Sequence, residues 1–133
     1  ADEIGMIVEA SLAHRIDGLI VSNTTLERPE TLRSPDAHET GGLSGTPIRP
    51  FAEKALRAAA EAANGRLPLI AVGGIDSGAE AYARIRLGAS AVQIYSALIY
   101  EGPGLVARIK RDLAARLRAD GFSTAAEAVG APR

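Results

Sequence analysis

Apolar residues recur along the chain with two alternating spacings, one typical of helices and one typical of short buried strands. Residues 2–14 place apolar side chains every three or four positions, which predicts a helix that begins almost at the first residue. The segment DGLIVSN at 17–23 is a short β-branched run between turn-forming residues, which predicts a strand buried on both faces. The runs at 67–74 and 91–97 have the same character and predict two further strands.

Helical patterns separate these strands. A helix is expected over about 51–63, with alanines and a leucine on its packing face. Ser77 and Glu80 have the spacing of a capping box, so the next helix is expected over 78–87. Gly88 then supplies a left-handed stop.

The rest of the chain consists of one further helix, a tail and a long loop. The helix begins after Gly102 and Pro103 and ends at Gly121, with one apolar and one basic face. The tail from Phe122 is expected to be loosely attached. The segment 26–50 is rich in Pro, Gly, Ser, Thr and charge, and a loop of this length is usually functional or disordered.

Each predicted strand is followed by a helix, and this alternation decides the fold class. Such an order is typical of an α/β fold with parallel strands and right-handed crossovers. No linker or internal repeat interrupts the pattern, so residues 1–133 are expected to form one domain or part of one.

Composition excludes several classes of function. With 15 Lys and Arg against 16 Asp and Glu, the chain lacks the broad basic field that nucleic acid or an anionic membrane requires. It contains no cysteine, which removes disulfides and thiolate metal sites and suits a cytoplasmic location. No apolar run approaches the ~20 residues of a membrane span, and no signal peptide is recognisable. His14 and His38 lack ligand spacing, and no catalytic triad or carboxylate pair is evident.

Two strand ends carry the features of a phosphate site. Gly73 and Gly74 end the second strand just before a helix, where free N–H groups and the helix dipole favour an anion. Ser96 ends the next strand, and loops after the last two strands of (β/α)₈ barrels often bind phosphate. The alternative is that the two glycines only make a tight turn.

Two other polar segments belong to the same predicted rim. The SNTT sequence at 22–25 and the GGLSG sequence at 41–45 offer short polar groups that suit a planar heterocycle. The alternative reading is a hydroxyl-rich turn and a flexible glycine loop.

Four longer motifs contain these segments: DGLIVSNTTLERP, ETGGLSGTPI, LPLIAVGGIDSG and GASAVQIYSALIYEGP. Their order and spacing resemble the C-terminal part of the quinone-linked (class 2) dihydroorotate dehydrogenases. GGLSG alone would fit other flavin- or phosphate-binding barrels, whereas SNTTLERP followed by ETGGLSG favours class 2 over the soluble class 1 enzymes. The resemblance covers essentially the whole chain.

The resemblance implies an FMN-binding (β/α)₈ TIM barrel that oxidises dihydroorotate to orotate in pyrimidine biosynthesis, with a membrane quinone as electron acceptor. It also implies a peripheral location on the cytoplasmic side of the bacterial inner membrane. By the family pattern, Asn23 and Thr24 hydrogen-bond the orotate ring, and Ser22 lies beside the flavin. Ser44 and Gly45 contact FMN.

The phosphate of FMN is assigned by the same resemblance to a backbone cradle. Its members are Gly73 and Gly74 with Tyr95 and Ser96. Relatives often have Thr where this chain has Ser96, and the hydroxyl is retained. The residues themselves predict no metal site, since the chain has no cysteine and His14 and His38 lack ligand spacing.

A complete barrel needs roughly 250 residues and eight strands, so this chain corresponds to only the sixth to eighth strands. By the family pattern the catalytic serine base and the membrane- and quinone-binding helices lie in the other part. The chain alone is therefore expected to be inactive, and the remainder of the barrel is an expected partner. Two other hypotheses stay open, namely a phosphate-binding barrel segment for a non-flavin ligand and a barrel fragment that binds nothing.

Overall fold

Three short strands form one parallel sheet at the centre of the structure. A computed structural model describes residues 2–132. The strands are β1 (Leu19–Val21), β2 (Leu69–Val72) and β3 (Ala91–Gln93), in the spatial order β1-β2-β3. Both neighbour pairs are parallel, which confirms the α/β fold predicted from the sequence.

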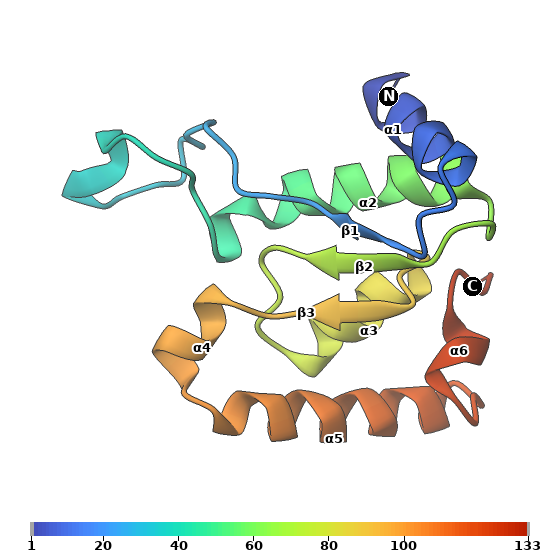
Figure 1. The fold of residues 1–133 in the computed structure, drawn as a ribbon. Coiled ribbons are helices and arrows are strands. Elements are labelled where there is room, and N and C mark those ends of the chain that lie inside the picture. The colour runs from blue at the N-terminus through green and yellow to red at the C-terminus, as the bar shows by residue number, and fades with distance from the viewer. Residues whose placement is uncertain (1, 133) are drawn as a thin grey trace.

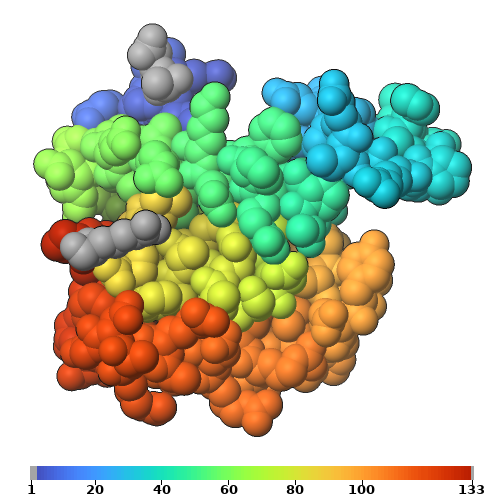
Figure 2. Space-filling view, turned by 180° about the vertical axis from the view of Figure 1, so that it is seen from behind, coloured from blue at the N-terminus to red at the C-terminus, as the bar shows by residue number. Residues whose placement is uncertain are grey.

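Helices cover one face of this sheet (Figure 1). They are α1 (Asp2–Ala13), α2 (Arg49–Ala63), α3 (Gly78–Arg86) and α5 (Gly104–Ala119). The short helix α4 (Ser96–Glu101) lies beyond the end of β3, and α6 (Ala125–Ala128) follows α5 at the other end of the structure (Figure 1). Short 3₁₀ turns lie at Pro35–His38 and Thr46–Ile48. Figure 2 shows α2, α3 and α5 in green, yellow and orange on the helical side. None of the helices within residues 2–132 combines the length and apolarity that crossing a bilayer requires.

The two faces of the sheet differ in burial. Val21, Ala71 and Val92 lie in register on the helix-covered face, where Val21 and Ala71 are buried. Ile20 and Ile70 are paired on the opposite face, and Ile20 is 55% exposed. The expectation of a first strand buried on both faces is therefore wrong for the described residues, because helices cover only one side.

The helices follow the predicted patterns closely. The buried residues of α2 recur at helical spacing (Ala52, Leu56, Ala59 and Ala63), which confirms its predicted packing face. The Ser77 hydroxyl accepts a hydrogen bond from the Glu80 N–H at 3.2 Å, so the predicted cap of α3 is present. Gly88 has a φ of +116°, as its predicted left-handed stop requires.

The long segment between β1 and α2 extends away from the sheet, in cyan in Figure 1. Arg28 organises it by donating hydrogen bonds to the carbonyls of Glu39 and Gly41, at 2.7 and 2.8 Å. A further bridge joins Thr25 to Leu43 and returns the chain to the sheet edge. Side-chain contacts from one arginine thus give this loop a defined course.

Two regions differ from the sequence-based expectation. The strand predicted to reach residue 97 stops at Gln93, and the short helix α4 begins at Ser96. The tail, expected to be loosely attached, contains α6, whose Ala128 is fully buried against Ile85 and Leu117. Helix α6 has only four residues, which is too few to show a repeating apolar pattern in the sequence. Its packing is therefore seen only in its tertiary contacts.

The packing of the tail gives a testable prediction. Ala128→Glu should place a carboxylate in an apolar contact and lower the local stability by about 2 kcal/mol or more, because an unpaired buried charge is costly. Limited proteolysis should then cut after α5 faster than in the unmodified protein. Ala126→Glu is the matched control, since Ala126 is exposed on the same helix. Equal cleavage of both variants would contradict the packed tail.

Candidate functional site

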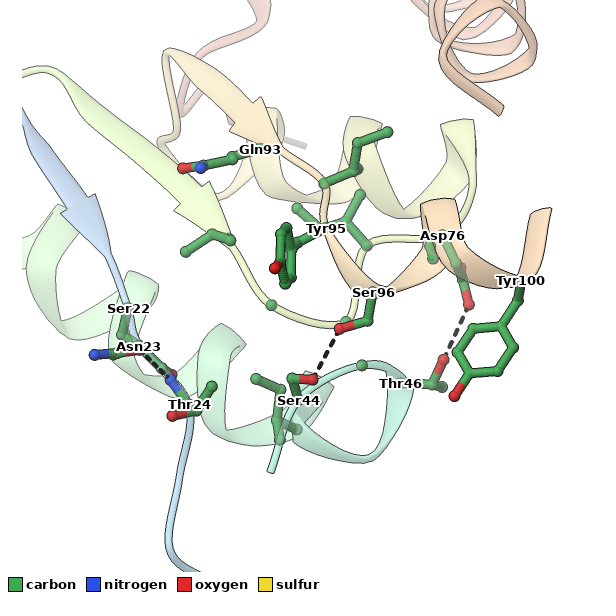
Figure 3. Close-up of a pocket in the computed structure, with 18 of the residues that line it drawn as sticks. Ser22, Asn23, Thr24, Ser44, Thr46, Asp76, Gln93, Tyr95, Ser96 and Tyr100 are labelled. Atoms are coloured by element: carbon green, nitrogen blue, oxygen red, sulfur yellow. Dashed lines mark hydrogen bonds between the residues drawn. The ribbon is translucent and has the colours of Figure 1, made fainter. Parts of the chain in front are cut away.

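A cavity of about 550 Å³ lies at the carboxyl ends of all three strands (Figure 3). Parallel strands deliver their carboxyl ends to one edge of a sheet, which is where α/β folds bind ligands. All nine residues assigned from the sequence line this cavity: Ser22, Asn23, Thr24, Ser44, Gly45, Gly73, Gly74, Tyr95 and Ser96. The structure therefore brings together four segments that are far apart in the sequence.

The end of β1 contributes Ser22, Asn23 and Thr24, and the peptide bond before Ser22 is cis. The Asn23 side-chain oxygen accepts a hydrogen bond from the N–H of the next residue, Thr24, at 2.8 Å, which orients the Asn23 amide. The Asn23 side-chain nitrogen donates no hydrogen bond to any residue within 2–132. Its two N–H donors are free for a ligand in the cavity.

The end of β2 makes a turn that only glycine can occupy without strain. Gly73 and Gly74 have φ angles of +105° and +71°. A Cβ atom at Gly74 would lie 2.8 Å from the Cβ of Arg49, and one at Gly73 would lie 3.1 Å from the Cβ of Ala52. The turn therefore packs tightly on the start of α2, so the tight-turn explanation for these glycines holds.

The same turn leaves backbone donors available. The N–H of Gly74 makes no hydrogen bond with the described part of the chain, and the same is true of Ser96 at the start of α4. Both residues line the cavity. A tight glycine turn and an anion site are thus compatible at this position.

The end of β3 is joined to the GGLSG loop by a hydrogen bond between side chains. The Ser96 hydroxyl donates to the Ser44 hydroxyl oxygen at 2.8 Å (Figure 3). Gly45 has a φ of +82°, and a Cβ there would lie 3.7 Å from the Cβ of Ser96. Tyr95 is 77% exposed at the cavity wall. The hydrogen bond between Ser96 and Ser44 therefore joins the GGLSG loop to the end of β3 at the cavity.

Sequence reasoning missed several residues of the cavity wall. The polar ones are Thr46, Asp76, Gln93, Tyr100 and Glu101, and the apolar ones are Ile20, Ile48, Val72, Ile75, Ile94 and Ala97. Gln93 could have been found from strand alternation, since it is a polar side chain on the open face of β3. Tyr100 and Glu101 could not, because the short helix that carries them was not predicted.

The two carboxylates at the cavity wall are both paired with arginines. Asp76 lies 2.8 Å from a guanidinium nitrogen of Arg49 and also accepts a hydrogen bond from Thr46 at 3.3 Å. Glu101 lies 2.7 Å from Arg108. Pairing reduces the repulsion that these carboxylates would exert on a bound anion. The cavity thus offers hydroxyls, an amide and backbone N–H groups between apolar walls, which suits a planar ligand that carries an anionic group.

Comparison with known proteins places this geometry in a family. The family model described as dihydroorotate dehydrogenase matches residues 1–117. A dihydroorotate dehydrogenase (quinone) of Rhodospirillum rubrum is 61% identical over 130 residues, which cover 98% of this chain and 35% of the relative. The mitochondrial dihydroorotate dehydrogenase (quinone) of Oryza sativa subsp. japonica is 48% identical and is matched over 27% of its length.

Solved structures agree with the sequence relatives. The crystal structure of the Eimeria tenella enzyme in complex with ferulenol superposes with a TM-score of 0.93 at 44% identity, covering 97% of this chain and 34% of that one. The chain therefore spans about a third of the length of the relatives it matches. Its three strands and their helices are part of a TIM barrel, and the chain belongs to the quinone-linked dihydroorotate dehydrogenase family.

Proposed function

We propose that these 133 residues form part of an enzyme that oxidises dihydroorotate to orotate and passes the electrons to a quinone. This reaction belongs to de novo pyrimidine biosynthesis. Family membership supports the proposal. The observation that carries it is the cavity itself, in which three polar strand ends meet and the N–H groups of Gly74 and Ser96 have no partner among the described residues.

FMN is the proposed cofactor, and the cavity suits it in two respects. The turn at Gly73 and Gly74, together with Tyr95 and Ser96, offers backbone donors for a phosphate group. The apolar side chains at the wall suit the flat ring system, which Ser22, Ser44 and Gly45 would contact from the rim. When bound, FMN supplies a two-electron acceptor for the hydride that leaves the substrate.

Asn23 and Thr24 are the proposed orotate contacts. The Asn23 oxygen is already held by the Thr24 N–H, and its side-chain nitrogen is left to donate to a ring carbonyl of the substrate. The contact with the Thr24 N–H therefore fixes which end of the amide faces the ligand. Asn23 is proposed to bind and orient the substrate and not to move a proton.

Other parts of the reaction are assigned outside these residues. The base that removes the substrate proton is expected in the remainder of the barrel, which is the proposed structural partner of this segment. The quinone site and membrane contact are expected there as well, on the cytoplasmic side of the bacterial inner membrane.

The absorption spectrum separates the flavin proposal from the alternative of another phosphorylated ligand. A purified complete enzyme that carries these residues should be yellow, with the two visible bands of oxidised flavin. Heat or acid should release FMN in a ratio of about one per chain. A colourless protein that copurifies with a sugar phosphate would overturn the flavin assignment.

Asn23 provides a sharp test of the substrate assignment in the complete enzyme. Asn23→Asp keeps an oxygen for the Thr24 N–H and so preserves that local hydrogen bond, but it removes the N–H donors and adds a negative charge. Orotate affinity should fall roughly tenfold to a hundredfold, with melting temperature and flavin content near normal. Asn23→Ala should lose both the hydrogen bond with the Thr24 N–H and the affinity. The flavin spectral shift on adding orotate measures the affinity, and unchanged affinity in both variants would leave Asn23 with a local structural role alone.

The 133-residue chain on its own should not oxidise dihydroorotate, however much FMN is added. It lacks the proposed base and most of the wall around the flavin. Dye reduction by the purified chain, checked by mass spectrometry for absence of a full-length contaminant, measures this. Turnover that scales with the amount of this chain would show that the assignment of the base is wrong.

A further inference from the structure

A buried arginine lies beneath the glycine turn at the end of β2. Arg84 of α3 is 1% exposed and is the one buried charged residue among those described. It is not part of the cavity wall. Transferring a guanidinium from water to a protein interior is costly, so its contacts need an explanation.

Arg84 contacts both a carboxylate and the turn. Its Nε and one Nη each lie 2.8 Å from the same Glu80 oxygen, and that Nη also donates to the Gly73 carbonyl at 3.3 Å. The other Nη is buried and has no partner within 2–132. The Nη that contacts the turn also lies 3.5 Å from the Arg49 carbonyl and 3.8 Å from a carboxylate oxygen of Glu53. Arg84 therefore joins two carboxylates, the start of α2 and the glycine turn, and not Glu80 alone.

Arg49 of α2 makes the equivalent contact with the next residue of the turn. Its Nε donates to the Gly74 carbonyl at 3.1 Å, and one Nη donates to Asp76 at 2.8 Å. The second oxygen of Glu80 lies 3.4 Å from the same Nε. Glu80 therefore bridges two arginines from different helices, and each arginine holds one carbonyl of the turn.

The direction of each carbonyl in the turn also determines the direction of the N–H group in the same peptide. In a planar trans peptide the C=O and the N–H point in opposite directions. The Gly73 carbonyl shares its peptide with the N–H of Gly74, and the Gly74 carbonyl shares its peptide with the N–H of Ile75; both peptides are trans. Neither N–H donates to a described residue, and both residues line the cavity.

We infer that Arg84 and Arg49 are positioning residues that hold the carbonyls of Gly73 and Gly74 away from the cavity, so that the N–H groups of Gly74 and Ile75 face a phosphate. The inference rests on the proposed FMN site and adds two residues that do not touch the ligand. A lysine cannot replace either arginine fully, because an ammonium lacks the planar fork that reaches a carboxylate and a carbonyl together.

Comparison of FMN with riboflavin isolates the phosphate contribution. The complete enzyme is stripped of flavin, and each flavin is titrated by the quenching of its fluorescence. Riboflavin lacks the phosphate, so the ratio of the two affinities reports on the cradle alone. The variants are Arg84→Lys and Arg49→Lys, which both keep the charge. Should Arg84→Lys fail to fold, Arg49→Lys carries the test, since its side chain is 31% exposed.

Arg66→Lys is the matched control. Arg66 also pairs with a carboxylate, Glu9 at 2.6 Å, and donates to a backbone carbonyl, that of Ala63 at 3.1 Å. It precedes β2, however, and does not line the cavity. Its substitution should leave both flavin affinities within about twofold of the unmodified enzyme.

The expected result is a roughly tenfold or greater loss of FMN affinity in Arg84→Lys and Arg49→Lys, with riboflavin affinity changed by less than about twofold. If these variants keep the unmodified enzyme's preference for FMN over riboflavin, whether or not both affinities fall, the positioning role is wrong. The proposed FMN site would remain intact in that case. An unmodified enzyme that does not prefer FMN would overturn the phosphate site itself, and the inference with it.

Discussion

The parallel pairing of β2 with both neighbours is the constraint on which the rest of the structure depends. It aligns Ile20 with Ile70 and Ile70 with Ala91, and so brings the three carboxyl ends to one edge. The polar groups of the candidate site lie at these strand ends, in the short helix α4 after β3, or in a loop that returns to them. The helices on the other face bury the core that holds this register.

The glycine turn after β2 depends on both the sheet and the helices. Its positive φ angles and its close approach to Arg49 and Ala52 exclude a side chain at either glycine without rearrangement. Two arginines from α2 and α3 hold its carbonyls, and the free N–H groups then face the cavity. The turn thus links the packed core to the proposed cofactor site. A substitution in the core beneath the turn should therefore change the affinity for the cofactor.

Much of the fold was predictable because the patterns are local. The Ser77 cap lies within one turn of helix, and the alanine face of α2 recurs at helical spacing along its length. The convergence of the site residues that follow the three strands results from parallel pairing, and the GGLSG loop joins them through the contact of Ser44 with Ser96. The arginine contacts were not predictable, because Arg84 is 11 residues from Gly73 and looks like part of a solvated helix face. The six-residue helix α4 and the packed tail are too short to give a period.

The central claim is that the free N–H groups at the ends of β2 and β3 hold the phosphate of a flavin. A crystal structure of the complete enzyme with its natural cofactor tests this most directly. The account predicts phosphate density within about 3 Å of the backbone nitrogens of Gly74 and Ser96, with the ring system extending toward Ser22 and Ser44. A flavin phosphate bound elsewhere in the barrel, with these two N–H groups facing only water, would contradict it.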